Sequence, residues 1–289
     1  MKPTPLATVN PMPSSPFAQL AMYPMAQLSA AYDVLWDRLR LALEADGVDG
    51  VPSALAWERD LHEAWIDPDA FITQTCGWPL VTALEGRVAL IGSFDVDVPW
   101  ASGGWYRSVI VSSKPLSVAE WRQRGDCRLI ANNPDSLSGW VSLSWAWGHR
   151  LDDVPFTGAH VESLREVAAG RADLASIDAV TFAHMVDAEP TVAARVHVVG
   201  HGPSVPSLPL VCAPRFASNV PALRRALAAV SRRAVRCTPE CDTTCPIPCG
   251  AVDDPELHAA LVTLKIRGFV AHDLEAFAHL PGLLPPPAG

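Results

Sequence analysis

"VPFTGAHVESLREVAAGRADLASIDAVTFAHM", residues 154–185, alternates between the patterns of strands and helices. A short strand leads to Gly158, a helix follows at about 161–169, and Gly170 is well placed to end that helix. "ADLASID" is a second strand, which ends in Asp178, and another helix follows it. Strands that alternate with helices favour parallel sheets with helices packed on them. The stretch therefore predicts an α/β fold with mixed, mostly parallel sheets.

The same alternation extends along most of the chain. At 26–45, Leu28, Leu35 and Leu39 recur at helical spacing with charged residues between them. The expected strands lie at 17–24, 53–57, 88–94, 106–113 and 128–131, with one more that begins at 70 and runs into residues 74–77. The further expected helices lie at 118–124, 136–147, 220–235 and 255–268.

Composition and charge exclude several classes of partner. The chain has 289 residues, a net charge of -9 and 49% hydrophobic residues, which suffices for two lobes with large cores. No long block of Lys and Arg is present, so nucleic acid and acidic membrane surfaces are not expected partners. A small anion is not excluded, because helix ends and backbone amides bind one locally.

Neither a membrane span nor a leader peptide is expected. No run of about 18 apolar residues occurs. Residues 1–16 hold several prolines and no apolar stretch, and we expect a disordered lead-in there. As written, the sequence predicts a cytoplasmic protein, or a periplasmic one if the start site is misassigned.

"NNPDSLSGW", residues 132–140, follows the apolar strand at 128–131. Asp135 or Ser136 is a good N-cap for the helix that follows. The free amides of that helix start, with the hydroxyls of Ser136 and Ser138, form an anion site. An ordinary capped helix is the alternative.

Polar groups stand at the carboxyl ends of several expected strands. In open α/β sheets, ligands bind in a crevice at those ends. A helix cap or a solvated loop residue is the alternative for each group alone. The candidates are Tyr23, Gln74, Thr75, Ser136, Ser138, His160 and Asp178.

Residues 157–182 resemble the segment of phosphonate-binding proteins, the solute receptors of phosphonate ABC transporters, that begins Ser-Gly-Ser-His and ends in Val-Asp-Ser-Val-Thr. "NNPDSLSGW" takes the place of the Ser-rich helix start of that family, and "AMYP" and "QTCGWPL" are similar to its first-lobe motifs. The resemblance covers about residues 17–212. It implies the type 2 periplasmic-binding-protein fold, in which two α/β lobes hold the ligand between them.

The resemblance also implies a division of the chain. A hinge of two crossings would leave the first lobe after Ser112 and return near Gly202, so that the lobes close over a ligand. The implied lobes are the first at 17–112 and 203–280 and the second at 113–202. Composition adds the lead-in at 1–16, a Cys-rich insertion at 237–249 that the family does not share, and a disordered Pro-rich tail at 281–289.

Site roles follow from the same resemblance. Ser136, the backbone amide of Leu137 and Ser138 would clasp the phosphonate oxygens. His160 would donate to the same oxyanion. Asp178 falls where the family places an acid that meets a ligand ammonium or hydroxyl.

The first-lobe side of the implied site is less polar. Tyr23 and Tyr106 would close it. Gln74 and Thr75 lie in a segment that carries no fixed charge. Cys76, before a helix start, is either a reactive thiolate or a small residue on the floor of the cleft.

"CTPECDTTCPIPC" holds four cysteines at four-residue intervals, Cys237, Cys241, Cys245 and Cys249. Three prolines make a continuous helix improbable there. A loop around zinc or an iron-sulfur cluster, a pair of disulfides and free thiols are the three alternatives. No other cofactor is expected.

The sequence thus predicts a solute-binding protein that closes two lobes on a small oxyanion, a phosphonate or phosphate compound. It would be the receptor of an ABC-type uptake system and have a permease as partner. The alternatives are a cytosolic enzyme on the same fold, as in menaquinone and thiamine-pyrimidine synthesis, and a sensory module that uses the cysteines.

Overall fold

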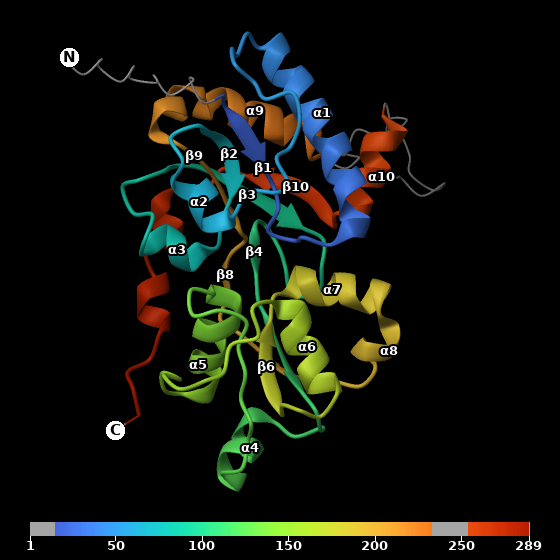
Figure 1. The fold of residues 1–289 in the computed structure, drawn as a ribbon, viewed down its shortest axis with the longest axis vertical. Helices are drawn as coiled ribbons and strands as arrows, with labels where there is room; N and C mark the ends of the chain where they lie inside the picture. Colours follow the sequence, from blue (N-terminus) through green and yellow to red (C-terminus); the bar gives the residue numbers. More distant parts are fainter. Residues whose placement is uncertain (1–14, 233–253, 289) are drawn as a thin grey trace, which may run out of the picture.

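The computed structural model describes residues 15–232 and 254–288. Nearly all of the expected lead-in, and all four cysteines of the Cys-rich segment, lie outside the described residues. The described chain forms two α/β lobes, one above the other in Figure 1.

The first lobe is built on a five-stranded sheet of order β1-β2-β9-β3-β10. Its strands are β1 (Phe17–Gln19), β2 (Ala70–Gln74), β3 (Ala89–Val96), β9 (Pro209–Cys212) and β10 (Ile266–Val270). Its helices are α1 (Ser29–Ala45), α2 (Leu61–Ile66), α3 (Gly77–Val81), α9 (Val220–Val230) and α10 (Pro255–Thr263), with 3₁₀ turns at Ala26–Leu28, Pro214–Asn219, Leu274–Phe277 and Leu280–Leu283.

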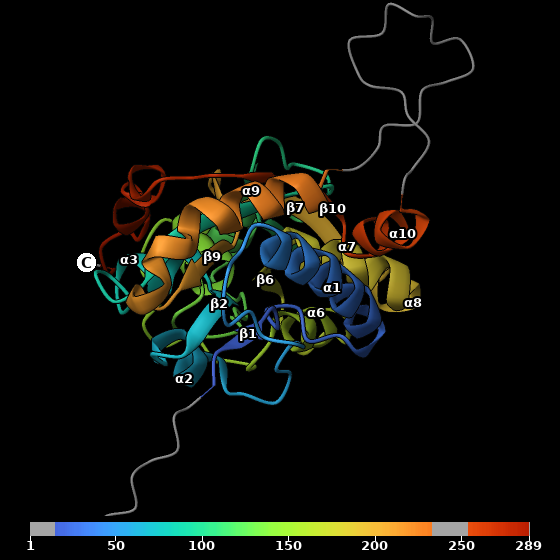
Figure 2. The same ribbon diagram turned by 90° about the horizontal axis from the view of Figure 1, so that it is seen from above.

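Helices α1, α9 and α10 lie together on the outer side of this lobe, where α1 contacts the other two (Figure 2). The helical spacing read at 26–45 is confirmed, because Leu28, Leu35 and Leu39 are all buried. The apolar face of α1 therefore anchors the helical layer of the first lobe.

The second lobe is built on a three-stranded sheet of order β6-β5-β7. Its strands are β5 (Val109–Ser112), β6 (Leu174–Ile177) and β7 (His197–His201). Its helices are α4 (Val118–Arg124), a π-helical turn at Leu137–Val141 that continues into α5 (Ser142–Trp147), α6 (His160–Ala168), α7 (Ala179–Ala188) and α8 (Pro190–Ala193).

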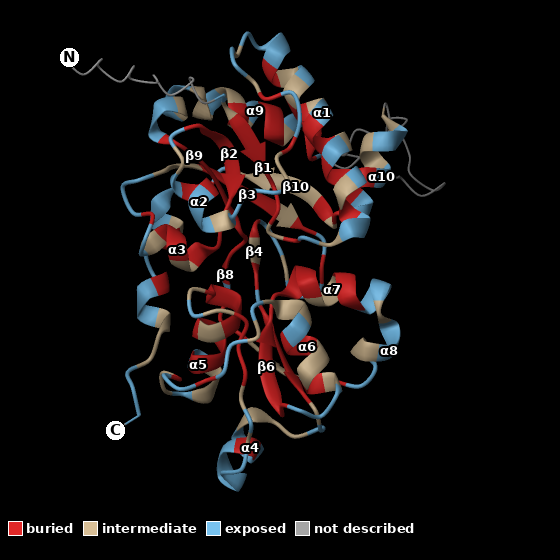
Figure 3. Ribbon diagram, viewed as in Figure 1, coloured by how far each residue is buried: buried red, intermediate tan, exposed pale blue. Residues whose placement is uncertain are grey.

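Each lobe has its own buried interior around its sheet (Figure 3). In the second lobe, Leu164 and Val167 of α6 pack with Val109 and Ile177 of the sheet. The α6–β6 connection is held by Arg128, whose guanidinium contacts the Asp173 carboxylate at 2.9 Å. This packing fixes where α6 and α7 begin.

The α/β class is confirmed, but the strand directions differ from the expectation. Among the described strands, β1 and β2 run parallel, whereas the other ladders are antiparallel. The expectation of mostly parallel sheets is therefore wrong. The expected strands at 53–57 and 128–131 reduce to isolated bridges at Leu55, Leu129 and Ala131.

The prediction of a helix over 255–268 is also wrong for its last residues. Helix α10 ends at Thr263, and Lys265 takes a left-handed conformation with φ 55°. The chain then turns into β10, which pairs antiparallel with β3. A non-glycine residue in this conformation marks a turn.

The lobes are joined by the short strands β4 (Trp105–Tyr106) and β8 (Val205–Pro206), which pair antiparallel. Because β5 lies in the second sheet, the first crossing precedes the predicted boundary after Ser112. The tail adds a third crossing on the left of Figure 1, where Arg150 N–H donates to the Pro286 carbonyl at 2.8 Å. The tail that was expected to be disordered thus contacts the second lobe at Pro286 and Pro287.

Candidate ligand-binding site

Several helices begin at the junction of the two lobes. Helix α3 follows β2, and α7 follows β6. The π-helical turn follows a segment that bridges β6 at Leu129, and α6 follows a segment that bridges Ala131 through Phe156. Ser136 caps the π-helical turn, its Oγ accepting from Gly139 N–H at 3.0 Å. Asp178 caps α7, its Oδ1 accepting from Thr181 N–H at 2.9 Å. Helix starts carry partial positive charge and unpaired amides, which suit an anion.

A cavity of about 210 Å³ lies between the lobes at this point. Its polar lining comes mainly from the second lobe: Asn132, Asn133, Asp135, Ser136, Ser138, His160, Asp178 and Thr181. Its apolar lining comes mainly from the first lobe: Met22, Pro24, Met25, Leu61, Trp65 and Leu208.

His160 is held in one orientation by two contacts. Its Nδ1 accepts from the Asp178 backbone N–H at 3.4 Å, and its Nε2 lies 2.9 Å from Ser138 Oγ. Because Nδ1 accepts, the neutral ring carries its proton on Nε2, which donates toward Ser138. Burial lowers the pKa of His160 although the negative charge of Asp178 opposes this shift. The imidazole is thus a neutral donor at the edge of the cavity.

Buried acceptors without partners surround this histidine. Asp178 Oδ2 and Asn132 Oδ1 are buried and form no hydrogen bond of good geometry within the described residues, and the buried Tyr106 hydroxyl lies beside Asp178 and Ser138. Burial, and after it the charge of Asp178, raises the pKa of Tyr23 and Tyr106 well above the ordinary value. Buried polar groups are normally paired, so these atoms indicate a missing hydrogen-bonding molecule.

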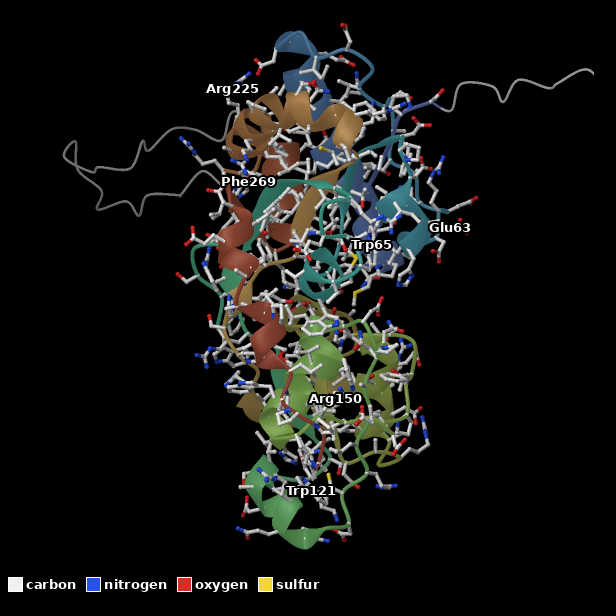
Figure 4. The ribbon with its side chains drawn as sticks, turned by 90° about the vertical axis from the view of Figure 1, so that its left-hand side faces the viewer. Glu63, Trp65, Trp121, Arg150, Arg225 and Phe269 are labelled. Atoms are coloured by element: carbon white, nitrogen blue, oxygen red, sulfur yellow. The ribbon has the colours of Figure 1, made fainter. Side chains whose placement is uncertain are left out.

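The first-lobe wall is mainly apolar, and Tyr23 and His62 are its polar side chains. The indole Nε1–H of Trp65 donates to the Gln74 carbonyl at 2.9 Å, so the ring itself is what faces the cavity. Figure 4 shows Trp65 on the first lobe, with Arg150 and Trp121 on the other lobe. Met25 and Leu61 extend the same apolar surface.

Contacts across the cleft hold the lobes together. Leu137 N–H donates to Cys76 Sγ at 3.3 Å, and His62 Nε2 lies 2.6 Å from Asp135 Oδ2. Lys265 Nζ contacts a carboxylate oxygen of Asp187 at 2.6 Å. Each pair joins one lobe to the other, so the structure is a closed one.

The structure brings together five of the predicted site residues, which line one cavity: Tyr23, Ser136, Ser138, His160 and Asp178. Gln74 instead lines a smaller cavity behind Tyr23. Thr75 is buried, and its hydroxyl donates to the Cys76 carbonyl at 3.5 Å. Tyr106 is buried behind the lining, close enough to Asp178 and Ser138 for both to act on its pKa.

The amide of Leu137 does not point to a free ligand position in this closed form, because Cys76 Sγ accepts it. Burial raises the pKa of the Cys76 thiol to about 11. A reactive thiolate at Cys76 is therefore not expected while the lobes are closed. The alternative, a small residue on the floor of the cleft, agrees with its position in the lining.

Sequence reasoning missed the apolar wall and the pair His62 and Asp135. Met22 and Met25 flank Tyr23 in the sequence, and Leu61 follows an Asp60 cap, but nothing in these segments separates a cavity residue from a core residue. Asn132 belongs to the motif "NNPDSLSGW", and its place in that motif could have marked it as a site residue.

A metal site finds no support in the part of the chain that the structure describes. No group of three or more His, Cys, Asp or Glu side chains there could hold an ion. Cys237, Cys241, Cys245 and Cys249 lie outside that part, so zinc or iron-sulfur binding by them stays a prediction.

Two α/β lobes that close on a cleft lined by helix starts define the class of two-lobed solute-binding proteins. Residues 98–277 match the family described as "ABC transporter, phosphonate, periplasmic substrate-binding protein", and the chain belongs to this family. The match gives no support to an enzyme on the same fold. No curated protein matches the chain significantly.

Solved structures agree on the fold. PhnD1 from Prochlorococcus marinus, in complex with methylphosphonate, has a TM-score of 0.68 at 12% identity, covering 93% of this chain and 96% of that one. A binding-protein component of an ABC phosphonate transporter from Pseudomonas aeruginosa has a TM-score of 0.62 at 14% identity, covering 93% and 86%. A Xanthomonas citri protein bound to ATP has a TM-score of 0.60 at 13% identity, covering 93% and 96%.

Within residues 15–232 and 254–288, no helix combines the length and the apolar character that a membrane crossing needs.

Proposed function

We propose that the chain binds a small organic phosphonate or phosphate compound in the cavity between its lobes, with the phosphorus oxygens at the second-lobe wall. The observation that carries this proposal is the Ser138–His160 pair, 2.9 Å apart, placed where α6 and the π-helical turn begin. Hydroxyls, an imidazole N–H and free helix amides are all donors, and they complement an oxyanion.

The organic part of the ligand would lie against the first-lobe wall. Met25, Leu61 and Trp65 face the cavity there. Their apolar surface gains free energy when a ligand covers it, at about 25 cal/mol per Å² removed from water. A cavity of about 210 Å³ also has room for more than a bare inorganic ion.

The family description supports the partner and the location. It names an ABC transporter and a periplasmic protein. We therefore place the chain in the periplasm as the receptor that delivers its ligand to an ABC permease.

Calorimetric titration tests the ligand assignment. Methylphosphonate, propylphosphonate and inorganic phosphate are titrated into the wild-type chain and into the His160→Ala variant. At least one phosphonate should bind the wild type, and His160→Ala should weaken that binding about 10- to 100-fold, because it removes the imidazole that orients the Ser138 hydroxyl at the oxyanion position and can itself donate there.

His197→Ala is the matched control, since His197 is exposed on β7 of the same lobe. It should bind like the wild type. Equal affinities of wild type and His160→Ala would remove the site assignment, and no heat with any phosphonate would remove the ligand class.

A further inference from the structure

The cavity holds a carboxylate where an anion is expected to bind. Asp178 is only 2% exposed. Its Oδ1 accepts the Thr181 N–H of the α7 cap. Oδ2 is buried and receives no hydrogen bond of good geometry within the described residues, and the Tyr23 and Tyr106 hydroxyls lie close enough to the carboxyl group for it to raise their pKa values. A buried carboxylate oxygen without a donor is costly, so a donor from the ligand would relieve that cost.

No permanent positive charge lines the cavity beside this carboxylate, because none of the described residues that line it is Lys or Arg. His160, which contacts Asp178 through a backbone N–H, is neutral at pH 7 because burial lowers its pKa. The titratable groups that surround Asp178 or face it across the cavity are Tyr23, Tyr32, His62, Cys76, Tyr106, Asp135, His160 and His184.

We infer that the site selects the singly protonated form of a phosphonate, and that the P–O–H group of the ligand donates to Asp178 Oδ2. The inference rests on the proposed function. A fully ionised phosphonate would place two negative charges beside a carboxylate with no cation between them. The protonated form instead supplies the donor that Oδ2 lacks, while its remaining oxygens accept from Ser138 and the helix amides. The proton stays on the ligand, and no bond is made or broken.

Two consequences distinguish this site from a general anion site. A sulfonate has the shape and the single charge of a protonated phosphonate but carries no proton at neutral pH, so it cannot donate to Asp178. Affinity for a phosphonate should fall as pH rises through its second ionisation, which for a phosphate monoester has a pKa of about 6 and for an alkylphosphonate lies higher.

The test compares methylphosphonate with methanesulfonate by calorimetric titration between pH 7 and 9. In this range His160 is already neutral, and the pKa values of Tyr23 and Tyr106 are raised beyond it. Methanesulfonate should bind about 100-fold more weakly than methylphosphonate, the effect of one lost hydrogen bond to a charged group with the repulsion added. Methylphosphonate affinity should fall about tenfold per pH unit once pH exceeds the second pKa of the ligand.

Asp178→Asn provides a readout that a structural role would not move. Asn caps a helix as well as Asp, so α7 should keep its start. The new amide N–H can donate to an ionised oxygen, so methanesulfonate should gain affinity, methylphosphonate should lose it, and the decline with pH should be abolished. Asp254→Asn is the matched control, because Asp254 caps α10 in the same way outside the cavity.

Three outcomes would overturn the inference. Equal affinity for methylphosphonate and methanesulfonate would show that a proton on the ligand does not contribute to binding. Tighter binding of 2-aminoethylphosphonate than of propylphosphonate, together with binding of 2-aminoethanesulfonate, would assign Asp178 to an ammonium group. Failure of every phosphonate to bind would overturn the proposed function itself, and with it this inference.

Discussion

The second-lobe wall and the first-lobe wall of the cleft offer a ligand different chemistry, and the chain builds them differently. The second-lobe wall is made of helix starts, where Ser136 and Asp178 hold local caps and His160 contacts Ser138. The first-lobe wall is made of apolar side chains such as Leu61 and Trp65.

This difference implies that the two walls recognise different parts of a ligand. Caps are local hydrogen bonds, so the donors of the second lobe are already arranged before the cleft closes. Apolar surface contributes only when it is covered, so the first lobe contributes on closure. The second lobe should therefore decide which anion binds, and the first lobe which size of substituent.

The largest effect should come from Trp65→Ala in the apolar wall. Trp65 is 5% exposed and its indole N–H is hydrogen-bonded, so truncation should lower the free energy of unfolding by about 3 to 5 kcal/mol. Urea denaturation measures this loss. Trp145→Ala, at a site 44% exposed, should cost far less, and similar losses in the two variants would contradict the assignment of Trp65 as a packed wall residue.

The next effect concerns His184, where the two lobes meet. Its ring lies 6.3 Å from that of Tyr23, and burial, aided by the charge of Lys265, lowers its pKa to about 4. The unfolded chain binds a proton near pH 6.5 and the folded chain does not. The contribution of His184 to the free energy of unfolding should thus be fully present above pH 6.5, and about 3 kcal/mol of it should be lost as pH drops to 4.

Denaturation curves at several pH values measure this loss, and His184→Gln should flatten it. The Asp173 carboxylate, whose pKa the Arg128 guanidinium lowers to about 2, contributes mainly below pH 4. An unchanged slope between pH 6.5 and 4 in His184→Gln would show that other groups cause it.

A smaller effect should follow Ser138→Ala in the polar wall. The hydroxyl contributes one donor at the oxyanion position, so phosphonate affinity should fall about tenfold. Unfolding should change by less than about 1 kcal/mol, because no core packing is lost. A large loss of stability with unchanged affinity would reverse the roles that we assign to the two walls.

The smallest effect should come from His62→Ala, which removes a contact between the walls. The His62 and Asp135 side chains are 66% and 38% exposed. Exposed pairs contribute between zero and about 1 kcal/mol, so ligand affinity should fall less than about fivefold. Titration at low and high salt checks this, since the difference from wild type should shrink as salt screens the pair. A difference that persists at high salt would mean that His62 contacts the ligand.

The sequence predicted the second-lobe wall better than the first-lobe wall, for a physical reason. A capped helix start is a local pattern, and Ser136 and Asp178 stand at such starts as expected. The apolar wall joins residues from separate segments, and a Leu that lines a cavity has no local signature that a core Leu lacks.

Strand direction and pairing were unpredictable for the same reason. The partner of β10 is β3, which lies far away in the sequence. Ile266–Val270 follows a helix without a proline or a glycine between them, so the helical pattern of the sequence continues through Lys265. The left-handed turn at Lys265 is imposed by tertiary packing, which overrides local preference.

Because of the Cys76–Leu137 contact, the exposure of the Cys76 thiol depends on whether the cleft is open or closed. While the lobes are closed, the thiol is 6% exposed, accepts an amide of the other lobe and is protonated because burial raises its pKa to about 11. Separation of the lobes removes both the cover and the amide. The rate at which an alkylating reagent modifies Cys76 should therefore measure how often the lobes open. A bound ligand should lower this rate in proportion to the fraction of the protein that holds it.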